Sequence, residues 1–168
     1  MILGMSVQTF TILHVIISLI AIASGIIVLI GMFGSQSQPR WTALFLATTI
    51  LTSVTGFGFP NTTVTPGIVV GIISLVVLAI ALAALYLFRL AGHWRWIYVA
   101  CAVIALYLNV FVAVVQSFQK IGALHALAPT QSEPPFAITQ IAVLAIFVVL
   151  GILAAIRFRP VAAQLARA

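Results

Sequence analysis

The chain has 168 residues, of which 64% are hydrophobic and only 5% are charged, and its mean hydropathy is +1.34. A water-facing surface needs roughly a quarter of charged residues, so this composition excludes a soluble monomer. Seven Lys and Arg residues, one acidic residue and one cysteine also exclude a disordered tail, a secreted disulfide scaffold and a coiled coil. The composition predicts an integral membrane protein in contact with the lipid bilayer.

Apolar runs define the expected helices, because about 20 residues of helix are needed to cross a hydrocarbon layer of about 30 Å. Polar or Pro- and Gly-containing breaks separate the runs, and no break is long enough for a soluble domain. The prediction is an all-α membrane protein, a five-transmembrane-helix bundle in a single domain of residues 1–168. The expected helices cover residues 8–33, 41–59, 67–90, 96–118 and 136–158, and the long loop covers 119–135.

The Lys and Arg residues are distributed unequally over the two sides of these five spans. Lys120 is alone on one side, and basic residues accumulate on the cytoplasmic side of membrane proteins. We therefore expect the N-terminus and the loop 119–135 to lie outside and the C-terminus in the cytoplasm. The side predicted to be cytoplasmic holds Arg40, Arg89, Arg95, Arg157, Arg159 and Arg167.

Polar side chains recur at helical spacing within four of the spans. Polar groups inside a membrane usually face the bundle interior or a wet cavity. Most of these residues fall in the outer halves of their helices, so we expect one polar pocket that opens outward beneath the loop 119–135. The candidate ligand-binding residues of the spans are His14, Thr52, Thr55, Asn109, Gln116 and Gln140. Alternatively, these side chains only form hydrogen bonds from helix to helix.

The outward loop adds His125 and the only acid of the chain, Glu133. We expect these two residues to cover the pocket, with Lys120 as a charge partner. The alternative role of Glu133 is at the start of the last helix, where a carboxylate is favoured by the helix dipole.

Histidines suggest a metal ion or a haem, because neutral imidazole is a common ligand of both. His14 and His125 are the candidate metal ligands on the outer side. A lipid-soluble quinone is a further candidate cofactor, since a histidine and amides could hold its carbonyl groups. No HxH, HxxxH or CxxC spacing occurs, and Cys101 lies within an apolar run, so the sequence does not select one cofactor.

Enzymatic and nucleic-acid functions find no support in the sequence. It has no paired carboxylates, no phosphate-binding glycine loop and no nucleic-acid motif. Whether a reaction is catalysed stays open. A transporter ranks below the binding function, because no relay of ionisable groups crosses the expected membrane.

The segments from Trp41 to Phe57 and from Leu124 to Phe136 resemble small bacterial inner-membrane proteins with several spans and no assigned function. The resemblance extends over most of the chain. It implies a multi-pass protein of the bacterial inner membrane, and it implies no activity, cofactor or site residue.

Two functions follow as hypotheses. The first is the binding of a small ligand or redox cofactor in the outward pocket, with His14 as the primary contact. The alternative is a noncatalytic interaction or assembly subunit, bound to a membrane-protein partner or to further copies of itself. Small residues on one face of the third span, Gly67, Gly71 and Ser74, motivate this alternative.

Overall fold

The computed structural model describes residues 4–59 and 65–160, and this part of the chain is all-helical, without strands. The elements in chain order are α1 (Val7–Phe33), α2 (Pro39–Gly56), α3 (Pro66–Leu82), the π-helical turn η1 (Ala83–Leu87), α4 (Trp94–Lys120), the short α5 (Gly122–Leu127) and α6 (Pro134–Arg157).

The helices begin where the sequence supplies a cap or a proline. The Ser6 hydroxyl accepts a hydrogen bond from the Thr9 amide at 3.1 Å, and Thr65 accepts one from the Ile68 amide at 3.4 Å. These bonds satisfy N–H groups that have no partner inside the helix. Pro39 and Pro134 occupy the first helical positions of α2 and α6, where the missing N–H costs nothing.

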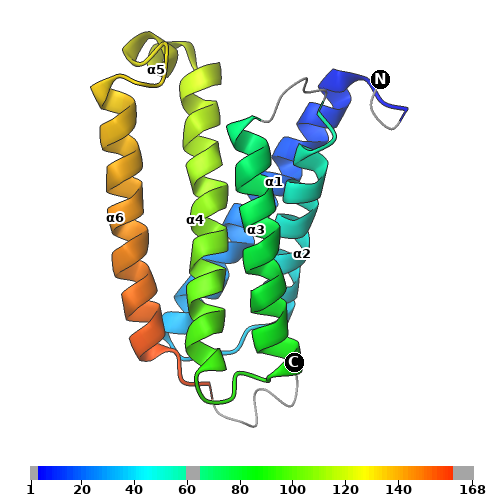
Figure 1. Cartoon of the computed structure of the whole chain (residues 1–168), viewed down its shortest axis with the longest axis vertical. Coiled ribbons are helices and arrows are strands. Elements are labelled where there is room, and N and C mark those ends of the chain that lie inside the picture. The colour runs from blue at the N-terminus through cyan, green and yellow to red at the C-terminus, as the bar shows by residue number, and fades with distance from the viewer. Residues whose placement is uncertain (1–3, 60–64, 161–168) are drawn as a thin grey trace.

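Successive long helices run in opposite directions, and α4 is the central one. It lies between α3 and α6, while α1 passes obliquely behind it, and α5 sits above the end of α4 (Figure 1). Helix α1 also packs along α2. Consequently α6 has only two long neighbours, α4 and part of α1, in the described chain.

Four helices are long and apolar enough to cross a membrane: α1, α3 together with η1, α4 and α6. This finding suggests membrane insertion. The 18-residue α2 is not among them in the described chain, since Arg40 and several threonines lower its hydropathy. It nevertheless runs antiparallel between its neighbours in the same bundle (Figure 1).

The third helix ends before the predicted boundary at Leu90. The Phe88 amide bonds to the Ala83 carbonyl at 2.9 Å, which widens the last turn into η1. Arg89 and Leu90 then adopt left-handed backbone conformations, with φ of 48° and 58°, and Gly92 follows at 53°. This turn reverses the chain and buries Leu90 at the end of the bundle. Such conformations are costly for residues other than glycine and persist only where packing holds them.

The arginines gather at one end of the bundle, hereafter the arginine-rich end. Arg40 begins α2, Arg95 begins α4, and Arg89, Arg157 and Arg159 follow or end the helices that descend to the same end (Figure 1). Lys120 ends α4 at the opposite end, and Arg167 lies outside the described residues. The continuous core of buried side chains occupies the arginine-rich half of the bundle. There, small residues allow helices to approach closely; Gly25 of α1 lies against Phe45 and Leu106.

Candidate functional site

His14 of α1 forms a defined contact with α2. Its Nδ1 lies 2.7 Å from the Thr55 hydroxyl oxygen, and this hydroxyl is itself 2.7 Å from the Leu51 carbonyl oxygen. A hydroxyl has a single hydrogen, so when Thr55 donates it to Leu51, it accepts from His14. In that arrangement the neutral imidazole carries its proton on Nδ1, and Nε2 presents a lone pair.

The surroundings of His14 form a small aromatic niche at the end of α1 and α2 that lies opposite the arginine-rich end. The Phe59 ring stands edge-on to the imidazole, with ring centroids 5.3 Å apart, and Phe59 in turn packs against Phe10 at 5.2 Å. Gly56 lies beside the ring, and a Cβ there would be in ordinary contact with His14 Cε1 at 3.8 Å. The imidazole is half-buried. Nε2 makes no hydrogen bond to residues 4–59 or 65–160.

Asn109 takes part in a different contact, between α4 and α2, and Thr52 of α2 is not bonded in it. Asn109 donates from Nδ2 to the Thr49 hydroxyl at 3.1 Å, and both residues are buried. The Thr52 hydroxyl is buried and has no hydrogen-bond partner among the described residues. Interhelical hydrogen bonds of this kind contribute on average about 0.6 kcal/mol in a membrane.

Gln140 forms a third contact, which Gln116 does not join. Gln140 of α6 is buried and donates from Nε2 to the Phe111 carbonyl of α4 at 3.3 Å. Its Oε1 is buried without a partner in the described part of the chain. Gln116, near the end of α4, is exposed.

The loop 121–133 is fastened to α4 and α6. Gln131 donates from its side chain to the Val115 carbonyl at 3.0 Å, and Phe118 packs edge-on against Phe136 at 5.4 Å. His125 is exposed on α5. Figure 1 shows α5 above α4 and α6, on the opposite side of the bundle from the start of α1, so the structure does not bring His125 to His14.

Glu133 immediately precedes α6, but its carboxylate bonds backward into the turn. It accepts hydrogen bonds from the Thr130 amide, the Thr130 hydroxyl and the Ser132 amide at 2.9–3.1 Å. Desolvation raises the pKa of Glu133, but these hydrogen bonds to the charged form outweigh it and hold the pKa below its usual value. The ionised carboxylate therefore stabilises this turn, and we expect that contribution to be complete above about pH 4.5 and to fall as the pH drops through the lowered pKa.

The sequence-predicted residues are thus distributed over separate contacts. His14 and Thr55 join α1 to α2, Asn109 joins α4 to α2, Gln140 joins α6 to α4, and Glu133 closes its own loop. In the described residues no group of three or more His, Cys, Asp and Glu side chains has a metal-binding arrangement. His14, with its unoccupied Nε2, is the member of the set best placed to contact a ligand.

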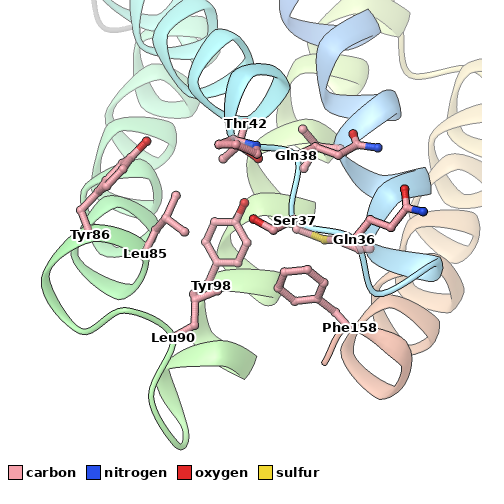
Figure 2. A pocket seen from close by; sticks show the side chains of 12 residues that line it. Gln36, Ser37, Gln38, Thr42, Leu85, Tyr86, Leu90, Tyr98 and Phe158 are labelled. Carbon is pink, nitrogen blue, oxygen red and sulfur yellow. The ribbon is translucent and has the colours of Figure 1, made fainter. Parts of the chain in front are cut away.

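A polar recess that the sequence analysis did not identify lies at the arginine-rich end. It is formed where the segment 36–39, the start of α2, the end of η1 and the start of α4 meet (Figure 2). The recess has about 20 Å³ in which the centre of a water molecule fits. Its polar walls are Gln36, Ser37, Gln38, Thr42, Tyr86 and Tyr98. The available signal was the run of polar residues 36–38, which also has the composition of an ordinary turn.

Comparison with known proteins gives no relative: no family model, curated protein or solved structure matches the chain.

Proposed function

We propose that the chain is a bacterial inner-membrane protein that crosses the membrane five times, with its N-terminus outside and its C-terminus in the cytoplasm. Four long apolar helices support insertion, and α2 runs between α1 and α3 in the same bundle. The exposed cations Arg40, Arg89, Arg157 and Arg159 favour the cytoplasm for the arginine-rich end.

Its function is to bind a small lipid-soluble ligand at His14. The observation that carries this proposal is the Nδ1 to Thr55 contact, because it leaves Nε2 as an acceptor when the Thr55 hydroxyl donates to Leu51. The helix position of His14 lies in the outer half of α1, beside Phe10 and Phe59. An apolar molecule that offers a hydroxyl or N–H donor, such as a quinol with one of its two hydroxyls, is the class of ligand that fits this environment. A single imidazole does not by itself select a metal ion or haem.

This function is tested by identifying the small molecules that co-purify with the protein. We expect mass spectrometry and absorbance of protein extracted with its native lipids to detect one such ligand. His14→Ala removes the acceptor and should lower its occupancy about fivefold, the effect of one hydrogen bond of about 1 kcal/mol. Thr55→Val keeps the imidazole but frees its orientation, so its loss should be smaller.

His125→Ala is the matched control, since His125 is exposed on α5 and should leave the occupancy unchanged. The proposal fails if no molecule co-purifies, or if His14→Ala retains the ligand at the level of His125→Ala.

The alternative, an interaction or assembly subunit, is favoured by α6. Only Gln140 and Ala154 of this 24-residue helix are buried, and Ile138 and Ile141 are each 65% exposed. The third helix offers less for a partner than its sequence suggested, because Gly71 lies against Phe57 and Ser74 is buried inside the bundle.

Cysteine crosslinking in native membranes distinguishes this alternative from simple lipid exposure. In a Cys101→Ala background, Ile141→Cys on the exposed face should capture the partner or a second copy. Ala154→Cys is the matched control, because Ala154 is 0% exposed. Recovery of the uncrosslinked monomer from both variants would remove the alternative.

A further inference from the structure

The short helix α5 carries large apolar side chains that the bundle does not bury. None of its residues is buried, and Leu127 is 57% exposed. Ile121, which immediately precedes α5, is 52% exposed. These side chains therefore contact whatever surrounds this end of the bundle.

Helix α5 is held at a fixed height above the end of α4 (Figure 1). Leu124 is half-buried, and Ala128, which follows the helix, is 0% exposed. Beyond them, the Gln131 side chain donates to the Val115 carbonyl of α4 at 3.0 Å. The loop is thus fastened to α4 on the far side of α5, so the exposed side chains cannot withdraw by a movement of the whole loop.

The two sides of α5 differ in the size of their exposed side chains. Successive residues of a helix are about 100° apart, so Leu127 lies about 60° and Ala126 about 160° from Leu124. Leu124 is on the side that contacts the bundle. Ala126 therefore faces away from the bundle, whereas Leu127 lies next to the contact surface and is still exposed. The large apolar side chain is on the side nearer to the apolar helices.

The length of α4 places α5 at the level of lipid headgroups. Helix α4 has 27 residues, which gives it a length of about 40 Å. A bilayer with its headgroup regions is also about 40–45 Å thick. Trp94 and Trp96 begin α4, and tryptophan is enriched at the boundary between membrane and water. With these residues at one boundary, Lys120 reaches the opposite headgroup layer, and α5 follows immediately.

Apolar surface and a cation adjoin α5 at this level. Ile138 lies in the second turn of α6 and is 65% exposed, so the apolar surface of α6 continues almost to the loop. Lys120 is exposed at the end of α4. A lysine can lay its alkyl chain along apolar surface while its ammonium group reaches the headgroup phosphates. Glu133, the only acid of the chain, uses its carboxylate within its own turn.

We infer that α5 is an interfacial anchor, which inserts Ile121 and Leu127 into the lipid layer at the end of the bundle opposite the arginine-rich end. Its partner is the lipid surface, because the apolar side chains lie at headgroup level and continue the apolar surface of α6. The anchor and the tryptophans at the start of α4 hold this helix at a fixed depth from both ends. The inference rests on the membrane insertion proposed above and not on ligand binding at His14.

Spin labels on the full chain test the inference in vesicles of phosphatidylethanolamine and phosphatidylglycerol. In a Cys101→Ala background, Ile121→Cys or Leu127→Cys carries a nitroxide, and its collisions with oxygen and with a nickel chelate give its depth. We expect both labels about 5–10 Å below the headgroup boundary, where oxygen is the more frequent collision partner. The matched control is Ala126→Cys on the opposite side of α5. Its label should lie about 10 Å higher, the diameter of a helix, and collide mainly with the nickel chelate.

A label at Val76→Cys separates failure of the anchor from failure of membrane insertion. Val76 is 56% exposed in the middle of the span formed by α3 and η1. A Val76 label that collides mainly with the nickel chelate would remove insertion and the anchor together. A Val76 label in lipid, with Ile121 and Leu127 labels as accessible to nickel as the Ala126 label, would overturn the anchor alone. Labels at Ile121 and Leu127 shielded from both reagents would overturn it too, because protein and not lipid would then cover α5.

Discussion

Gly25→Leu is expected to destabilise the bundle by about 3 kcal/mol or more, in the upper range for overpacking of a tight core. A Cβ at this position would lie 2.6 Å from Leu106 Cδ1 and 2.8 Å from Phe45 Cε2. Leu106 and Phe45 are each 1% exposed and belong to the continuous core, so neither can turn outward to make room. The expected result is a separation of α1 from α2 and α4 at their closest approach.

The free energy of unfolding in detergent micelles measures this effect. Ala23→Leu is the matched control, because Ala23 lies two positions away on the same helix and faces outward. Its added side chain meets detergent or lipid and should change the stability by less than about 0.5 kcal/mol. Similar losses in Gly25→Leu and Ala23→Leu would contradict the packing at Gly25.

Hydropathy was sufficient to locate the long helices, but it did not determine how they cross. The apolar run 67–90 contains no proline, and no polar residue lies between Ser74 and Tyr86, so its pattern cannot reveal that the helix gives way to η1 at Ala83. The oblique course of α1 was equally hidden. It depends on small residues such as Gly25 finding bulky partners on two other helices, which is a property of the pairing and not of one helix.

The polar residues illustrate a similar limit. Helical phase groups polar residues on one face of a helix, but it does not specify which helix each face meets. His14 Nδ1 is paired with Thr55 of the adjacent helix, and Gln140 Nε2 with the backbone carbonyl of Phe111. In an apolar medium the nearest acceptor suffices, so several polar stripes need not share one cavity.

The recess could not be derived from the sequence for a related reason. Tyr98 occurs at the start of an apolar run, and Gln38 occurs in a segment with the composition of a turn. Their proximity depends on the chain reversal at Arg89 and Leu90 and on the close approach of Gln38 to Gly31. Both features are tertiary and leave no periodic signal.

Arg95→Ala is expected to have the second large effect, by loosening α6. Arg95 is partly buried at the start of α4, and its Nη1 donates to the carbonyl oxygens of Phe158 and, at 3.5 Å, Ala155. The last carbonyls of a helix lack partners within it, and a cation there is favoured by the helix dipole. The guanidinium also lies 4.4 Å from the centroid of the Trp96 ring.

Loss of this charged hydrogen bond should lower the free energy of unfolding by about 1.5–3 kcal/mol. Arg95→Lys should have a stability between those of the natural chain and Arg95→Ala, because lysine keeps the charge but lacks the planar guanidinium group. Since α6 is held mainly by α4, chymotrypsin should also cleave faster at Phe158, which is 4% exposed in the intact bundle. Arg157→Ala is the control, because Arg157 is exposed and close to the same site. If Arg157→Ala lost as much stability and was cleaved as fast, the effect would come from charge at this end of the bundle and not from the link between α4 and α6.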